Sequence, residues 1–353
     1  DAGKSIHLEG EKDTLIDLNR AGVPLIEIVT EPVIHSAEEA GAFLAEVRRI
    51  VRYLGICDGN MEEGSLRCDA NVSVRLKTTE ELGKKVELKN MNSIKSVIRA
   101  IEHEMERQID LIEDGEEILS ETRTFDVNTG RSSGMRTKEE LNDYRYFPEP
   151  DLSPIHVTEA WLHEIRDTQP TLPAQFRRKF QEEFGLSLYD AEVLTDKKEL
   201  AYFFDTFCEH TSNYKAAANW TMGPIKSYLN EHGKEIDQLE IGVSRLAEVI
   251  DLVDQNTVSF SAASQQLLPY LFEHPHVVAS EAAKSLNILQ DSDSGSIQPI
   301  IDVVIAENPD KVKAYRNGKK GLIGMFMGEV MKKTQGKVDP KVANKLLRDS
   351  LEL

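Results

Sequence analysis

The chain lacks any run approaching the roughly 18 consecutive apolar residues that a membrane-spanning helix needs. It has only three cysteines, Cys57, Cys68 and Cys208, and no CxxC pair, which excludes a zinc ribbon and a disulfide framework. This cysteine usage favours a reduced, cytoplasmic compartment. Because no apolar run is long enough to span a membrane, we also expect no membrane partner.

Several common catalytic signatures are also absent. There is no GxGxxG, GxSxG or HExxH, and none of the cysteines lies in a recognisable nucleophile setting, so the chain has no obvious means of hydrolysing an amide by itself. His274-Pro275-His276 favours a turn over a metal site. Gly3-Lys4-Ser5 is similar to the end of a P-loop, but its first glycine would precede residue 1 and no clear helix start follows.

What is present predicts a folded protein of two or three domains, from 353 residues of which 40% are apolar. The net charge is −19, yet the residues from 310 to 353 carry eleven Lys and Arg against five acids, a local charge of +6. An acidic body with a basic tail suggests that the tail binds a polyanion. The alternative is a merely solvated helical face, and charge alone does not separate the two.

The first 150 residues mix strands and helices. The apolar run 24–30 predicts a buried strand. The capping box Ser36–Glu39 opens a predicted helix that Gly55 ends, and a second helix follows the cap Asn92-Ser93.

From 158 to 283 the pattern is helical throughout, and the final stretch is helical as well. Pro148, Pro150 and Pro154 mark one domain boundary, and the composition of the polar stretch 290–296 indicates a second, solvated linker. The predicted fold class is α+β, with a mixed sheet-and-helix domain at 1–157, an all-helical domain at 158–287 and a small helical tail at 288–353.

Residues 66–76 alternate with period two, which predicts a strand with one buried face. Its polar face carries Arg67, Asp69, Asn71, Ser73 and Arg75. The segment 85–89 continues the alternation, so Glu87 and Lys89 join this face if the two strands are adjacent. Carboxylates beside cations suit Mg²⁺ with phosphate oxygens, and arginine suits bidentate phosphate contacts. The alternative is an ordinary solvent-facing hairpin with cross-strand ion pairs.

Glu27 lies inside the apolar sequence Leu25-Ile26-Glu27-Ile28-Val29. Because burying an unpaired carboxylate costs several kcal/mol or more, we expect it to be paired, protonated or bound to a metal. The alternative is a wet strand face or a structural arginine partner.

Long ordered motifs converge on one family. They are DAGKS (1–5), DLNRAGVPLIEIVTEP (17–32), MEEGSLRCDANVSVR (61–75), VELKNMNS (86–93), TRTFD (122–126), MRTKEELNDYRYFPEPDL (135–152), YDAEVLT (189–195) and GLIGMFMGEVMKKTQGKVDPKVANKLL (321–347). With these strings the chain resembles the GatB family, which supplies one of the subunits of the aspartyl/glutamyl-tRNA(Asn/Gln) amidotransferases. The family usually has sequence before DAGK, including part of its active site, so we expect this chain to be truncated at its N-terminus.

The resemblance implies conversion of Glu-tRNA(Gln) to Gln-tRNA(Gln), or of Asp-tRNA(Asn) to Asn-tRNA(Asn). ATP phosphorylates the side-chain carboxylate, and ammonia channelled from a glutaminase partner then replaces the phosphate. The implied cofactors are ATP and Mg²⁺. The implied partners are GatA and GatC in a heterotrimer, together with the misacylated tRNA. The archaeal relative GatE carries a large inserted domain that this sequence does not show.

The resemblance also implies site residues within a "cradle" domain. Glu27 and Glu87 are expected to hold Mg²⁺, and Arg67, Arg75 and Lys89 to stabilise the transferring phosphoryl group. Asp69, Asn71 and Asn90 are candidates for positioning, and Lys4 for contacting the nucleotide. The tRNA candidates lie in a tail similar to YqeY and are Lys319, Lys320, Lys332, Lys333 and Lys337. A second hypothesis is a catalytically silent tRNA-binding scaffold.

Overall fold

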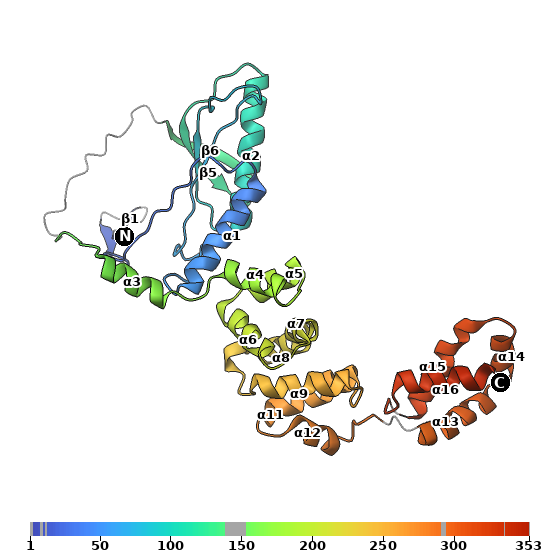
Figure 1. The fold of residues 1–353 in the computed structure, drawn as a ribbon. Coiled ribbons are helices and arrows are strands. Elements are labelled where there is room, and N and C mark those ends of the chain that lie inside the picture. The colour runs from blue at the N-terminus through green and yellow to red at the C-terminus, as the bar shows by residue number, and fades with distance from the viewer. Residues whose placement is uncertain are drawn as a thin grey trace. The chain divides into compact units, whose positions relative to one another are not determined.

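The computed structural model describes residues 3–7, 10, 13–137, 153–290, 294–334 and 336–352. The chain divides into two compact units (Figure 1). The first comprises Asp1–Arg48 and Asp58–Leu152, and the second comprises Arg49–Cys57 and Ser153–Leu353. The first unit mixes sheet and helix whereas the second is helical, so the predicted α+β class is confirmed.

The first unit contains two sheets. The smaller is the antiparallel pair β1 (Lys4–His7) and β2 (Thr14–Asp17). The larger has the order β3-β4-β5-β6, in which β4 and β5 are parallel and the outer pairs are antiparallel. Its strands are β3 (Ala70–Val72), β4 (Val86–Lys89), β5 (Glu121–Asp126) and β6 (Arg131–Thr137).

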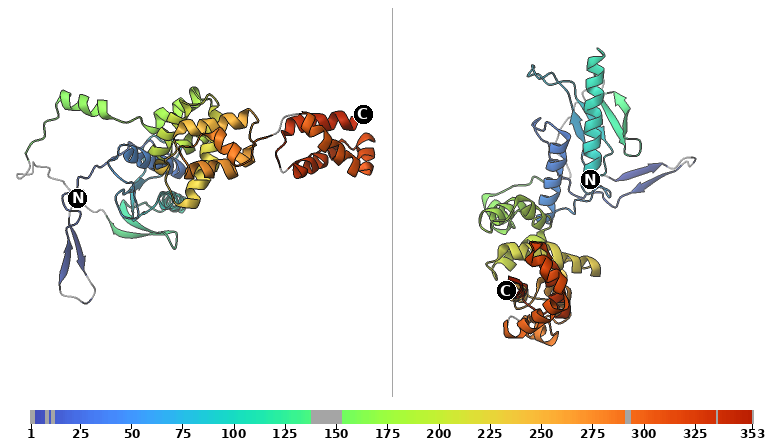
Figure 2. Two further views of the ribbon diagram at one scale, coloured as in Figure 1. Left: turned by 90° about the horizontal axis from the view of Figure 1, so that it is seen from below. Right: turned by 90° about the vertical axis from the view of Figure 1, so that its right-hand side faces the viewer.

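One face of the larger sheet is covered by helix α2 (Ile94–Glu113), which contacts β3 and β6 (Figure 2). The helix begins as predicted at Ser93, whose side chain accepts a hydrogen bond from the backbone N–H of Ser96. Val86 and Leu88 are fully buried under it. Because side chains alternate along a strand, Glu87 and Lys89 lie on the opposite, polar face.

Helix α1 (Ala37–Tyr53) also follows the prediction. The Ser36 hydroxyl accepts from the backbone N–H of Glu39, and Gly55 takes a left-handed conformation (φ 69°) just after the helix ends. The helix begins in the first unit, and its last residues, from Arg49 on, belong to the second.

Two strand predictions need correction. Residues 24–30 form no strand and are all exposed. Their composition indicated burial, but a strand needs a hydrogen-bonded neighbour, and none of the described strands pairs with them. Of the strand predicted over 66–76, only Ala70–Val72 forms a strand, because its hydrogen-bonded pairing with β4 spans three residues. Exposure still alternates from 66 to 75, as the sequence indicated.

The second unit is helical from 159 onwards, as predicted. Its elements before the tail are α3 (Glu159–Thr168), α4 (Pro173–Glu182), α5 (Leu188–Leu194), α6 (Lys198–Cys208), α7 (Tyr214–Trp220), η1 (Thr221–Ile225), α8 (Lys226–His232), η2 (Ile236–Gln238), α9 (Val243–Asp254), α10 (Phe260–Ala262), η3 (Ala263–Leu267), α11 (Leu268–Glu273) and α12 (Ala279–Ser285). Of these, the elements from α4 onwards share one core, with Phe180, Phe204 and Phe207 fully buried, whereas α3 has no buried residue. The sequence His274-Pro275-His276 lies in a turn, as predicted.

The tail consists of α13 (Ser294–Glu307), α14 (Pro309–Arg316), η4 (Lys320–Leu322), α15 (Ile323–Lys333) and α16 (Pro340–Glu352). It has a hydrophobic core of its own, with Phe326 and Leu347 fully buried. Helix α13 begins inside the stretch predicted as a linker, of which 291–293 lie outside the described residues. No helix in the described parts of the chain is both long and apolar enough to cross a membrane.

Candidate functional site

The polar face of the larger sheet brings together candidate site residues from separate segments of the sequence. Asn71 on β3 lies directly opposite Glu87 on β4. Glu87 in turn is the register partner of Thr122 on the parallel strand β5. Side chains of paired residues lie on the same face, so carboxylate, amide and hydroxyl groups gather over the middle of the sheet. We call this group the polar strip: Asp69, Asn71, Glu87, Lys89, Asn90, Thr122 and Thr124.

Lys89 lies between the two carboxylates of the strip. Its Nζ is 2.7 Å from Asp69 Oδ2 and 3.1 Å from Glu87 Oε1. The exposed fractions of the three side chains fall from 48% for Asp69 through 31% for Lys89 to 17% for Glu87. The strip is therefore open to solvent at Asp69 and more enclosed at Glu87.

The charge state of Lys89 follows from these contacts. Partial burial alone would lower the pKa of its ammonium group, but hydrogen bonds to Asp69 and Glu87 outweigh that effect and raise the pKa above its ordinary value. Lys89 is therefore a cation at neutral pH, and it donates to carboxylate oxygens on both sides.

Two threonines on β5 complete the strip and were not selected from the sequence. The Thr122 hydroxyl, which is nearly fully buried, donates to Glu87 Oε2 at 2.8 Å. The Asn90 side-chain amide donates to Thr124 Oγ1 at 2.6 Å. Asn90 itself has a left-handed backbone (φ 66°), which asparagine tolerates better than most residues. The spacing of the two threonines in TRTFD (122–126) predicts that they lie on the same face of a strand. That this strand lies beside β4 is seen only in the structure.

Arg67 and Arg75 are exposed on either side of β3. Exposed and less exposed residues alternate along 66–75, and both arginines fall on the exposed positions, as do Asp69 and Asn71. Their assignment to phosphoryl-group stabilisation stays a prediction.

Glu27 does not meet the expectation of burial. It is exposed, within a segment that forms no strand. The described contacts of Glu87 are with Lys89 and Thr122. Among the described residues, no group of three or more His, Cys, Asp or Glu side chains is close enough together to hold a metal ion. The pairing of Glu27 with Glu87 around Mg²⁺ thus stays a prediction.

Lys4 is the first residue of β1, and the chain continues from it into the β1–β2 hairpin. A P-loop needs a glycine-rich loop that leads into a helix, so this surrounding does not favour one. The assignment of Lys4 to nucleotide contact is untested.

The five candidate lysines of the tail differ in their surroundings. Lys319 and Lys332 are exposed. Lys333 forms an ion pair with Glu307 at 2.9 Å. Lys320 lies 4.3 Å from the ring centre of Tyr315 and 3.7 Å from a Glu352 carboxylate oxygen.

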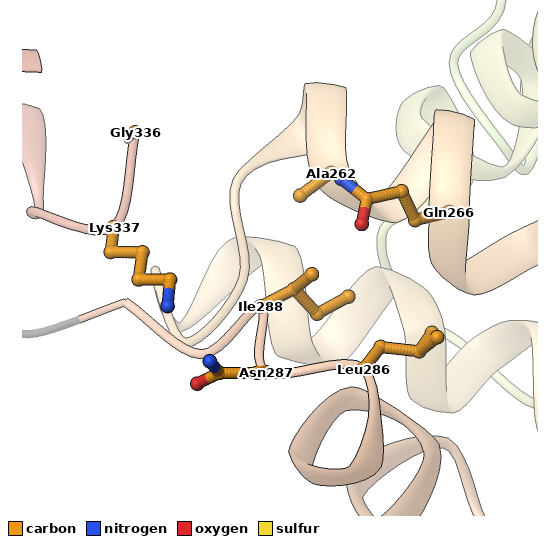
Figure 3. Close-up of a pocket in the computed structure, with 7 residues that line it drawn as sticks. All are labelled: Ala262, Gln266, Leu286, Asn287, Ile288, Gly336 and Lys337. Atoms are coloured by element: carbon orange, nitrogen blue, oxygen red, sulfur yellow. The ribbon is translucent and has the colours of Figure 1, made fainter. Parts of the chain in front are cut away.

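Lys337 lines a pocket of about 280 Å³, which Figure 3 shows. The other lining residues are Ala262, Gln266, Leu286, Asn287, Ile288 and Gly336. Lys337 is the only charged group among them, so the pocket does not gather catalytic groups as the polar strip does.

Comparison with known proteins matches the N-terminal and the C-terminal parts of the chain to family models. The family model described as the GatB/GatE catalytic domain matches residues 1–163, and the model described as the GatB domain matches residues 202–351. Three curated relatives are each named as the B subunit of an aspartyl/glutamyl-tRNA(Asn/Gln) amidotransferase. The relative from Synechococcus sp. (strain JA-3-3Ab) is 47% identical, across 100% of this chain and 72% of its own length.

The relative from Oleidesulfovibrio alaskensis is 48% identical, across 99% of this chain and 73% of its own. The relative from Pseudomonas syringae pv. tomato is 45% identical, across 100% and 74%. The chain belongs to the GatB family. The polar strip lies within the stretch matched by the GatB/GatE catalytic domain, and the tail lysines lie within the stretch matched by the GatB domain. Membership of the GatB family implies the use of ATP.

Proposed function

We propose that the polar strip is the place where this chain activates a carboxylate attached to tRNA. The chain is a subunit of a tRNA-dependent amidotransferase, a carbon–nitrogen ligase with glutamine as amido donor. It serves the conversion of Glu-tRNA(Gln) to Gln-tRNA(Gln), of Asp-tRNA(Asn) to Asn-tRNA(Asn), or of both. The observation that carries the proposal is the Asp69–Lys89–Glu87 cluster on the polar face of the sheet.

The chemistry explains why such a cluster is useful. A carboxylate is a poor electrophile, because its oxygen is a bad leaving group. Transfer of the ATP γ-phosphoryl group to the carboxylate oxygen gives an acyl phosphate, from which phosphate leaves readily when ammonia attacks. Catalysis of phosphoryl transfer consists mainly of positioning and of stabilising charge on the phosphoryl oxygens. Lys89, Arg67 and Arg75 supply positive charge for that task.

The side chains of the strip also suit a divalent cation. Carboxylate, amide and hydroxyl oxygens are the hard ligands that Mg²⁺ prefers. Glu87 would hold Mg²⁺ together with Glu27, and Asp69 is the further carboxylate at hand. The ion would neutralise charge on the ATP phosphates. Lys89 would then keep the strip from becoming a concentration of negative charge that repels the nucleotide.

The chain needs partners for the second half of the reaction. The absence of a recognisable amidase nucleophile in its sequence supports a separate glutaminase, GatA, as the source of ammonia. GatC would complete the heterotrimer. The basic tail would bind the phosphate backbone of the misacylated tRNA. Nothing in the comparisons favours the alternative of a catalytically silent scaffold.

The decisive experiment measures aminoacyl-tRNA-dependent ATP hydrolysis by the complex reconstituted with GatA and GatC. Glu87→Gln should abolish most of the hydrolysis while tRNA binding persists. The matched control is Glu117→Gln, an exposed carboxylate in the same unit that pairs with Lys84 outside the strip. Full activity in Glu87→Gln would refute the site. Glu27→Gln is tested in parallel, and normal activity there would remove Glu27 alone from the proposal.

A further inference from the structure

The covered side of the larger sheet holds a buried polar network that the proposed chemistry does not use. Glu104 and Gln108, one helical turn apart on α2, are both fully buried. Both lie in the stripe of α2 that faces the sheet, where Val97 and Ile101 are core residues. Burying a carboxylate and an amide in that position is costly unless each is fully hydrogen-bonded.

Gln108 bonds to the backbone where β3 ends. Its Nε2 donates to the carbonyl oxygen of Val72 at 3.1 Å, and its Oε1 accepts from the backbone N–H of Val74 at 3.1 Å. The ladder between β3 and β4 stops at Val72. One side-chain amide therefore supplies the donor and the acceptor that a neighbouring strand would otherwise give.

Glu104 fixes the orientation of that amide. The second Nε2 hydrogen of Gln108 is donated to Glu104 Oε1 at 2.8 Å, so the amide cannot rotate by 180° without losing bonds at both ends. Arg107 holds the same carboxylate through two hydrogen bonds of 2.7 and 2.9 Å. The negative charge on Glu104 is thereby paired, as a buried carboxylate requires.

The network continues to the other edge of the sheet. Arg123 on β5 lies 3.8 Å from Glu104 and forms an ion pair with Glu121 at 2.6 Å. The same guanidinium donates to the hydroxyl and the backbone carbonyl of Ser132 on β6, at 2.8 and 2.9 Å. A continuous series of polar contacts thus runs beneath the strip from β3, through α2, to β5 and β6.

We propose that Gln108, oriented by Glu104, is a positioning residue for the reaction on the opposite face of the sheet. By fixing the backbone from Val72 to Val74, it keeps Asn71 opposite Glu87 and sets the direction in which the chain continues to Arg75. Neither Gln108 nor Glu104 touches substrate in this role. The inference rests on the proposed function, because it assigns a purpose to the geometry of the polar strip.

The test uses Gln108→Met in the reconstituted complex. Methionine has a similar volume, but it cannot form the hydrogen bonds that Gln108 makes with the Val72 carbonyl, the Val74 N–H and the Glu104 carboxylate. The kcat for aminoacyl-tRNA-dependent ATP hydrolysis should fall roughly ten- to a hundredfold, while the tRNA Kd stays unchanged. Amide hydrogen exchange should accelerate in peptides covering 66–76 and stay unchanged in those covering 297–351.

The matched control is Leu44→Ala, which removes a buried side chain of the same core from α1 and leaves the hydrogen bonds between Gln108 and the backbone of β3 in place. It should lower the melting temperature at least as much as Gln108→Met and leave kcat within about twofold of wild type. An unchanged kcat in Gln108→Met, or an equal loss of kcat in the control, would overturn the positioning role. Either result would reduce Gln108 to a stabilising residue.

A second variant covers the case in which Gln108→Met fails to assemble. Glu104→Gln keeps an acceptor for Gln108 but removes the charge that Arg107 holds, so kcat should fall in the same direction by a smaller factor. An unchanged kcat in Glu104→Gln would also contradict the positioning role. If Glu87→Gln is fully active, the proposed site itself fails. The exchange result at 66–76 then still decides whether Gln108 fixes this backbone.

Discussion

The hydroxyl of Thr122 donates a 2.8 Å hydrogen bond to the carboxylate of Glu87 across two parallel strands. The bond fixes one carboxylate oxygen from the buried side, which leaves the other for Lys89. Thr122→Val preserves the shape and removes the donor. Because the freed carboxylate is then less well positioned, we expect tRNA-dependent ATP hydrolysis to fall about tenfold or more.

The control for this prediction is Thr168→Val in α3, where the hydroxyl donates only to carbonyls of its own helix. It should leave activity unchanged. Wild-type rates in Thr122→Val would show that the carboxylate of Glu87 needs no hydroxyl to hold it.

Local signals in the sequence account for the features that could be predicted. Helix α2 was predictable because its cap at Ser93 and its apolar spacing are local. The approach of Asp69 to Lys89 was predictable because alternation fixes the face and two consecutive strands commonly pair. Thr122 was not, because nothing local shows that a strand 35 residues further along lies parallel to β4.

Two other features show why composition misleads. The segment 24–30 is apolar enough for a buried strand, but pairing depends on what lies beside it, and its seven residues are exposed. Gln108 lies in an apolar helical stripe, where a polar residue signals a specific partner, yet the partner is backbone 36 residues away. Most of the motif at 135–152 lies outside the described residues.

Lys89 gives a prediction about pH. Its pKa is raised in the folded protein, so folding favours the charged form. Its contribution to stability is therefore complete below the unfolded pKa of about 10.5 and is lost as pH rises through the higher folded value. The difference in urea midpoint between wild type and Lys89→Met should stay constant from about pH 7 to 10 and shrink above about pH 10.5.

The same residue should also matter for activity. Lys89→Met leaves Asp69 and Glu87 facing one another without the intervening cation, and we expect at least a tenfold loss of tRNA-dependent ATP hydrolysis. Lys89→Arg keeps the charge and should recover part of the rate. A difference in urea midpoint that begins to shrink near neutral pH would contradict the raised pKa.

Tyr53, at the end of α1, is part of the core of the second unit and gives a prediction about stability. Its side chain is 1% exposed, and its hydroxyl donates to the carbonyl of Thr195 at 2.8 Å, with the carbonyl of Lys197 at 3.3 Å. Tyr53→Phe keeps the ring and leaves these carbonyls without the donor. We expect a loss of about 1–3 kcal/mol in unfolding free energy, measured by urea denaturation.

The matched control is Tyr189→Phe, because that side chain is 72% exposed. It should change stability by less than about 0.5 kcal/mol. Equal stability of Tyr53→Phe and wild type would mean that the hydroxyl contributes nothing net at this position.

The neighbouring lysines 332 and 333 separate phosphate binding from structural pairing in the tail. Lys332 is exposed, whereas Lys333 is 2.9 Å from Glu307 and already neutralises a charge within the protein. If Lys332 contacts a tRNA phosphate, Lys332→Gln should weaken binding and lower the slope of log Kd against log salt by about 0.7 to 0.9. Lys333→Gln should change that slope less, because its charge is shared with Glu307.

The measurement is a tRNA titration by the intact complex at several salt concentrations. Equal slopes for Lys332→Gln and wild type would exclude Lys332 from the tRNA interface, and a larger change for Lys333→Gln would reverse the assignment.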